Sequence, residues 1–119
     1  MKKTLVLGAS NNPERYSYMA VALLKKYGHP VLAIGRKAAT IGDTIIHGST
    51  IAEQGVDTVT LYLNPLAQEA YYSYFISLEP KRIIFNPGTE NEALEDLAKH
   101  HGIQCLEACT LVLLNTGQY

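Results

Sequence analysis

The sequence predicts an α/β protein in which helices cover both faces of a mainly parallel sheet. Short β-rich runs alternate with helical patterns along the whole chain, and parallel neighbours in a sheet need crossover connections of this kind. The 119 residues suit one domain spanning residues 1–119, and 47% hydrophobic residues are enough to build a buried core. We therefore expect a single doubly wound domain with a five-stranded sheet.

The expected strands are short runs rich in β-branched and aromatic residues, bounded by turn residues. The five main strands are expected at residues 4–8, 31–34, 56–63, 82–85 and 103–106. A small extra strand at residues 44–47 lies within the long connection after the second strand.

The first helix is expected at residues 17–27, because Met19, Ala22, Leu23 and Tyr27 recur at the spacing of one helix face. Gly28 would end this helix. A second helix is expected from Pro65 to about Leu78, with Asn64 as its N-cap.

A third helix is expected after the fourth main strand, where Thr89 and Glu92 form a T-x-x-E capping box. Leu94, Leu97, Ala98 and His101 would supply its core face, and Gly102 would end it. The apolar tail at residues 108–117 is interpreted as a short closing helix.

These elements describe a sheet of the Rossmann or flavodoxin type. Ligands of such sheets bind beyond the carboxyl ends of the strands, near the point where the strand order reverses. The functional residues are therefore expected in the segments that follow the strands, at residues 8–17, 35–37, 63–65 and 86–91 and after residue 106.

The loop after the first strand has one glycine, Gly8, where the dinucleotide fingerprint has three. A longer polar loop can still hold a diphosphate, with Arg15 forking onto phosphate oxygens and helix N–H groups behind it. The alternative, a solvated arginine at a helix start, stays open. The candidate ligand-binding residues of this loop are Gly8, Ala9, Ser10, Asn11, Pro13, Arg15, Tyr16 and Ser17.

The second main strand ends in Gly35-Arg36-Lys37. An NAD site has an acidic residue at this place, which binds the ribose hydroxyls. Two adjacent cations instead suit a ribose that carries an additional phosphate, as in NADP or coenzyme A. The alternative is that Arg36 and Lys37 are ordinary surface side chains that bind no ligand.

Over nearly its whole length the chain resembles the small stand-alone CoA-binding proteins of bacteria, which are related to the N-terminal domain of the succinyl-CoA synthetase alpha subunit. The matching stretches are GASNNPERYSYMAVALL, HPVLAIGRK, VDTVTLYLNP, RIIFNPGTEN and EACTLVLL. The resemblance implies that coenzyme A or an acyl-CoA binds with its phosphates on the loop at residues 8–17. It places the adenosine near residues 35–37, with Leu63, Asn64 and Pro65 beside the ligand and Asn86, Pro87 and Gly88 along the pantetheine arm.

Catalysis is left open by the sequence. The synthetase uses a phosphorylated histidine of a second domain, and none of the four histidines follows a strand at the expected site, so its chemistry is not carried over. An accessory or regulatory CoA-binding role is the first hypothesis. The alternative is an enzyme that acts on an acyl-CoA thioester or an NADP-like cofactor, with Ser10, Ser17 or Cys109 as nucleophile.

Two side chains outside the phosphate loop complete the candidate ligand-binding residues. Tyr62 is expected to touch the ligand, and Cys109 to lie near the thiol end of CoA. A mixed disulfide of Cys109 with CoA and a packed, unreactive thiol are both compatible with the sequence.

The remaining expectations concern partners and location. A net charge of −1 gives no general attraction to nucleic acid or membranes, and no stretch is apolar enough to cross a membrane. The N-terminus lacks a signal-peptide pattern, so a cytoplasmic protein with reduced cysteines and no metal site is expected. Tyr71, Tyr72 and Tyr74 suggest core packing and a subunit contact, so a homo-oligomer stays open.

Overall fold

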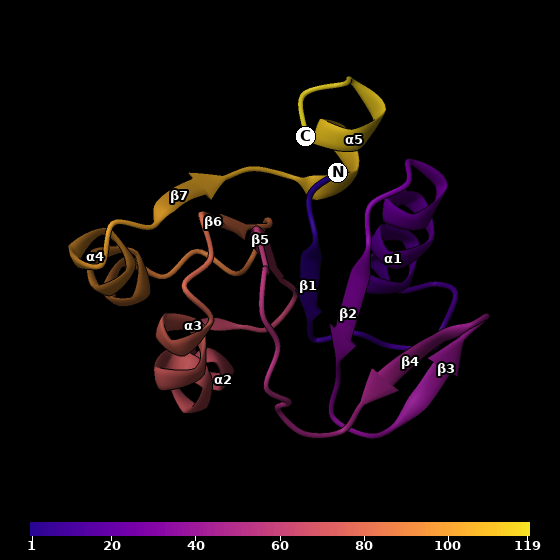
Figure 1. Ribbon diagram of the computed structural model, residues 1–119, viewed down its shortest axis with the longest axis horizontal. Coiled ribbons are helices and arrows are strands. Elements are labelled where there is room, and N and C mark those ends of the chain that lie inside the picture. Colours follow the sequence, from indigo (N-terminus) through magenta and orange to yellow (C-terminus); the bar gives the residue numbers. More distant parts are fainter.

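The computed structural model describes residues 1–119 and contains one seven-stranded sheet flanked by helices (Figure 1). The strands are β1 (Thr4–Leu7), β2 (Val31–Ile34), β3 (Ala39–Ile41), β4 (Thr44–His47), β5 (Thr58–Leu61), β6 (Arg82–Phe85) and β7 (Gln104–Glu107). The helices are α1 (Tyr16–Lys26), α2 (Pro65–Gln68), the 3₁₀ turn η1 (Glu69–Tyr71), α3 (Tyr72–Leu78), α4 (Glu92–His100) and α5 (Thr110–Asn115). The expected α/β class and the closing helix are confirmed.

The expectation of five strands is wrong, because the sheet has seven in the order β3-β4-β2-β1-β5-β6-β7. All neighbours pair in parallel except β3 and β4, which form an antiparallel hairpin around Gly42 and Asp43. β4 is the small extra strand expected from the sequence, and it joins the sheet beside β2. β3 has three residues and pairs with β4 alone, so its sequence is too short to show an alternating pattern.

Strand β1 lies between β2 and β5, and the chain builds the sheet outward from it in both directions. From β1 the chain first adds β2 on one side, and later returns to place β5 on the other. The strand order therefore reverses between β1 and β5, and the loops at the carboxyl ends of these two strands diverge there.

Alternate side chains of each strand point to opposite faces of the sheet, and each face has its own core. Leu5 packs in a cluster with Phe75 of α3 and Leu94 of α4, whereas the adjacent Val6 packs in a second cluster with Val21 of α1. Helices α2, α3 and α4 thus cover one face, and α1 and α5 cover the other (Figure 1).

The expected apolar face of α1 is correct only at Leu23, which is partly buried and packs against the core. Met19 and Tyr27 are 39% and 40% exposed, and Ala22 is also exposed. The helix instead buries a face of similar periodicity that lies two residues earlier and includes two small side chains: Ser17, Ala20, Val21 and Leu24. Small side chains allow the helix axis to approach the sheet closely, and this outweighs the burial of the larger residues.

The helical segment after β5 begins as expected and is then interrupted. The Asn64 side chain accepts a hydrogen bond from the Ala67 N–H at 2.9 Å, which confirms Asn64 as the N-cap with Pro65 at the first helical position. The 3₁₀ turn η1 then separates α2 from α3. Glu79 ends α3 in a left-handed conformation with φ of 48°.

The expected capping box at Thr89 and Glu92 is wrong. Asn91 caps α4, because its side-chain oxygen accepts from the Leu94 N–H at 3.2 Å. The Thr89 hydroxyl is buried and donates to the Asn86 carbonyl at 2.8 Å, so it closes the preceding turn instead. His101 was expected on the core face of this helix, but it lies exposed just after the helix end.

The C-terminal residue covers a buried cation at the amino edge of the sheet. Arg82 is 8% exposed, donates from Nε to the Thr58 hydroxyl at 2.7 Å and forms no ion pair. The Tyr119 ring lies 4.4 Å from its guanidinium carbon, a cation–π contact. Tyr119 is also hydrogen-bonded to Thr4 and Lys2, so the two ends of the chain lie side by side (Figure 1).

None of the helices combines the length and the apolar character that a membrane crossing requires.

Candidate functional site

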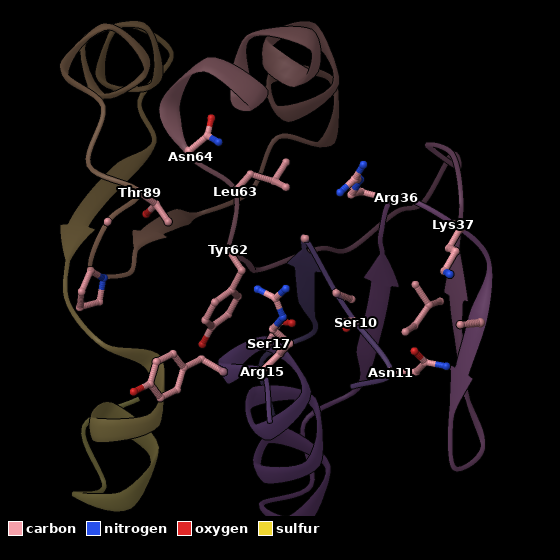
Figure 2. Close-up of a pocket in the computed structure, with 17 residues that line it drawn as sticks. Ser10, Asn11, Arg15, Ser17, Arg36, Lys37, Tyr62, Leu63, Asn64 and Thr89 are labelled. Atoms are coloured by element: carbon pink, nitrogen blue, oxygen red, sulfur yellow. The ribbon is translucent and has the colours of Figure 1, made fainter. Parts of the chain in front are cut away.

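A pocket of about 500 Å³ opens at the carboxyl edge of the sheet, where the strand order reverses between β1 and β5. Figure 2 shows the residues that line it, which come from the loops after β1, β2, β5 and β6, from β3 and β4 and from the start of α1. Its volume falls in the range of sites for small molecules and cofactors.

Fourteen of the eighteen candidate residues from the sequence line this pocket. They are Gly8, Ala9, Ser10, Asn11, Arg15, Tyr16, Ser17, Arg36, Lys37, Tyr62, Leu63, Asn64, Pro87 and Gly88. The other four, Pro13, Gly35, Asn86 and Cys109, do not line it. Three further residues line it: Ala39 and Ile46 lie outside the segments expected from the sequence, and Thr89 lies in the expected segment at residues 86–91 but was not among the candidates.

Gly8 is required at the base of the pocket by both its conformation and its surroundings. Its φ is +93°, a region that disfavours other residues, and a Cβ at this position would lie 2.8 Å from the Tyr62 carbonyl oxygen. The N–H groups of Gly8 and Ala9 both donate to the Ile34 carbonyl at 2.9 Å. The loop after β1 is thereby fixed against the ends of both neighbouring strands.

Local hydrogen bonds shape the rest of this loop. The Asn12 N–H donates to the Ser10 hydroxyl at 3.1 Å, and the Glu14 N–H donates to the Asn12 side chain at 3.0 Å. Arg15 follows as the N-cap residue of α1, with no side-chain cap and no acidic residue in the first turn. The N–H groups at this helix start are therefore available to an anionic ligand in the pocket.

Three cations surround the pocket without partners. Arg15, Arg36 and Lys37 are exposed and form no ion pair, and no acidic residue is among the lining residues. Arg15 lies near the middle of the pocket and Arg36 and Lys37 toward one end (Figure 2). The local field is therefore positive although the chain carries a net charge of −1.

Tyr62 forms part of the pocket wall beside Arg15 and Ser17 (Figure 2). Its hydroxyl oxygen is buried and has no hydrogen-bond partner. Burial, together with the nearby Cys109, raises the pKa of Tyr62 far above its usual range. The side chain is therefore a neutral phenol whose hydroxyl keeps its proton.

Asn86, expected along the ligand, does not line the pocket, and its side chain is bonded to neighbouring parts of the chain. It is 3% exposed, and its side-chain amide donates to the Thr60 hydroxyl at 2.7 Å and to the Leu61 carbonyl at 2.9 Å. Its side-chain oxygen accepts from the Thr110 N–H at 2.8 Å. Asn86 therefore joins β5 and β6 to the start of α5, and Cys109, half-buried, precedes that helix.

The side chain of Gln68 joins two walls of the pocket and was not singled out from the sequence. It is fully buried, and its amide nitrogen donates to the carbonyls of Leu63 and Thr89 at 2.9 and 2.8 Å. Glutamine is mostly exposed in proteins, so a single glutamine within a helical pattern gives no signal of such a role.

The nucleophiles weighed from the sequence have no activating base in this structure. No histidine or carboxylate is hydrogen-bonded to Ser10, Ser17 or Cys109, and the Ser10 hydroxyl accepts the Asn12 N–H. His, Cys, Asp and Glu side chains form no group of three or more that could hold a metal ion. The pocket offers cations, backbone N–H groups and neutral hydroxyls that could recognise an anionic ligand.

A positively charged pocket at the switch point of a doubly wound sheet is typical of domains that bind phosphate-bearing ligands. Comparison with protein families narrows this class: residues 2–115 match the model described as a CoA binding domain, and the chain belongs to this family. The resemblance drawn from the sequence is confirmed. A comparison with curated proteins found no match.

Solved structures of similar proteins agree with the fold. A crystal structure titled as that of an uncharacterized protein is 48% identical, with a TM-score of 0.97 over 100% of this chain and 98% of that chain. A hypothetical protein from Pyrococcus horikoshii OT3 is 22% identical, with a TM-score of 0.87 over 97% of this chain and 82% of that one. A protein from Thermus thermophilus is 20% identical, with a TM-score of 0.87 over 99% and 90% of the two chains. The last two show the fold alone.

Proposed function

We propose that this protein binds coenzyme A or an acyl-CoA in the pocket between β1 and β5, and that it acts as an accessory or regulatory module. The observation that carries the proposal is the set of three unpaired cations around a pocket without acidic residues. CoA carries a diphosphate and a separate 3′-phosphate on its ribose, so it offers anionic groups at two places.

The arrangement of the cations fits these two places. Arg15 stands at the uncapped start of α1, where backbone N–H groups and the helix dipole favour a diphosphate. Arg36 and Lys37 lie toward one end of the pocket (Figure 2), where they would meet the ribose phosphate. Ala39 and Ile46 provide apolar surface at the lining beside them, which suits an adenine ring.

The same features disfavour NAD. The segment after β2 offers Arg36 and Lys37 where an NAD site has a carboxylate for the ribose hydroxyls. The loop after Gly8 also lacks the second and third glycines that allow a dinucleotide to approach the backbone closely.

An accessory role agrees with the chemistry of the pocket, in which no candidate nucleophile contacts a base. We propose a cytoplasmic protein that uses CoA or its acyl esters as a bound signal or cargo. Turnover of an acyl-CoA by the purified protein would contradict this part of the proposal and would favour the enzyme alternative.

Native mass spectrometry of the purified protein, followed by calorimetry with CoA and NAD, tests the proposal. We expect a retained adduct of CoA or acyl-CoA mass, or saturable binding of added CoA, with NAD binding much more weakly. The absence of CoA binding in both measurements would refute the proposed function. Equal affinities for CoA and NAD would favour a redox role.

A further inference from the structure

We propose that Gln68 is a positioning residue that holds the two pocket walls on either side of the pantetheine arm, and so makes the site selective for ligands that carry this arm. The inference rests on the proposed function, because the arm is defined only when CoA is the ligand. It adds a residue outside the pocket lining to the determinants of specificity.

The two walls come from different parts of the chain. One is the loop after β5, which includes Leu63 and Asn64, and the other is the turn after β6, which includes Gly88 and Thr89. In Figure 2, Asn64 and Thr89 lie at the end of the pocket away from Arg36 and Lys37. The pantetheine arm of CoA is uncharged and gains nothing from nearby cations. When the phosphates bind near Arg36 and Lys37, we expect the arm to lie at the opposite end of the pocket.

Gln68 links these two walls through one side-chain nitrogen. Its two amide hydrogens serve the Leu63 carbonyl at 2.9 Å and the Thr89 carbonyl at 2.8 Å. The side-chain oxygen of Gln68 accepts from the Asn91 amide at 2.9 Å. Every polar group of this buried side chain therefore has a partner, which fixes its orientation.

The partners of Gln68 are themselves held in place. Thr89 closes the turn after β6 through its hydroxyl and its N–H, both bonded to the Asn86 carbonyl. The Asn91 amide also donates to the Tyr72 hydroxyl at 2.9 Å. Gln68 is thus the side chain through which a rigid turn on one wall sets the position of the loop on the other.

The phosphate end of the pocket packs against the loop after β5 at Gly8, but it also has anchors of its own. The loop after β1 is held by the Ile34 carbonyl, and Arg36 and Lys37 follow β2. Loss of the Gln68 amide should therefore weaken binding of whole CoA while leaving its nucleotide half unaffected. A residue that served only the stability of the fold would affect both ligands alike.

Gln68→Met tests this prediction, because methionine has a similar size but leaves both carbonyls without a donor. We expect Gln68→Met to weaken CoA binding by about tenfold, equal to about 1.4 kcal/mol, and to change the affinity for adenosine 3′,5′-bisphosphate by less than about twofold. Calorimetry measures both ligands, and thermal melts monitor the fold. Gln104→Met, at an exposed glutamine on β7, is the matched control and should leave both affinities unchanged.

If Gln68→Met does not fold, Gln68→Asn replaces it in the same test, since its shorter amide cannot reach both carbonyls. Equal losses for the two ligands, no loss for either, or wild-type protein that binds CoA without binding the bisphosphate would overturn the inference. Wild-type protein that binds neither ligand would refute the proposed function itself, and this inference with it.

Discussion

Gly35 lies directly against the backbone of Ala9: a Cβ atom at Gly35 would be 2.3 Å from the Ala9 carbonyl oxygen. The loops after β1 and β2 therefore approach each other closely at these two backbones. Gly35 does not line the pocket, yet it allows these two loops, which carry Ala9, Ser10, Arg36 and Lys37, to come together there.

Gly35→Ala is expected to lower the free energy of unfolding by about 1–3 kcal/mol, the usual cost of inserting a group into a packed site. It should also weaken CoA binding, because the Ala9 carbonyl and the loop behind it must move. Chemical denaturation and calorimetry measure the two effects. Gly48→Ala is expected to cost less, since a Cβ there would meet its nearest atom, the backbone nitrogen of Ala38, at 3.1 Å, against 2.3 Å at Gly35. Unchanged stability and affinity in Gly35→Ala would show that the contact is not restrictive.

Arg15→Ala is expected to weaken CoA binding by about 1.5–3 kcal/mol, the value of a hydrogen bond to a charged group. The side chain forms no ion pair and stands at the start of α1, beside the pocket. The loss should shrink as ionic strength rises, because exposed charges are screened. If the folded variant has the same dissociation constant for CoA as the wild type, Arg15 is a solvated side chain that does not bind CoA.

Removal of the 3′-phosphate from the ligand tests Arg36 and Lys37. We expect dephospho-CoA to bind more weakly than CoA to the wild-type protein, because the two cations after β2 lose their phosphate. In the double variant Arg36→Gln and Lys37→Gln, the difference between the two ligands should disappear. If calorimetry finds that the wild-type protein binds CoA and dephospho-CoA equally well, then Arg36 and Lys37 do not bind the 3′-phosphate.

The stability of the protein should fall as the pH drops below about 6.5, with His29 contributing to the loss. Burial and the neighbouring N-terminus, Lys2 and Arg82 lower the pKa of His29 from its usual value of 6.5. Its Nδ1 accepts the Lys2 N–H at 3.0 Å, which requires the neutral ring. Between the unfolded and the folded pKa the unfolded chain therefore binds a proton that the folded chain does not. The free energy of unfolding falls with pH across this interval, and the loss stays at its full value below the folded pKa.

His29→Gln keeps a hydrogen-bond acceptor without a titrating ring. Its free energy of unfolding, followed by urea denaturation between pH 7.5 and pH 5, should depend less on pH than that of the wild type. Identical slopes for the two proteins would exclude His29 as a source of the acid sensitivity. His101→Gln, at an exposed position, provides the control.

The sequence was sufficient for the order of the main elements and for most of the pocket. Parallel strands place their following loops at one edge, so residues as distant as Gly8, Arg36 and Leu63 could be grouped from the strand pattern alone. That these residues bind CoA stays a prediction, since their positions around a pocket define a shape and a charge.

The errors arose where tertiary packing chose between local alternatives. The burial of Ala20 in place of Met19 depends on how closely α1 approaches the sheet, which periodicity alone does not specify. Thr89 and Asn91 are both residue types that can cap a helix. Asn91 caps α4, because the Thr89 hydroxyl is already bonded within the preceding turn. Gln68 donates to two backbone carbonyls that lie 5 and 21 residues away in the sequence. No short sequence motif predicts contacts between residues this far apart.

The contact of Tyr119 with Arg82 affects the order in which the chain can complete its folding. Arg82 begins β6, but the ring that covers its guanidinium is 37 residues further along and leaves the ribosome much later. Until Tyr119 is in place, the Arg82 guanidinium lacks this cover, and the cost of burying an unpaired charge favours its contact with water. Complete burial of Arg82 therefore awaits the synthesis and docking of Tyr119.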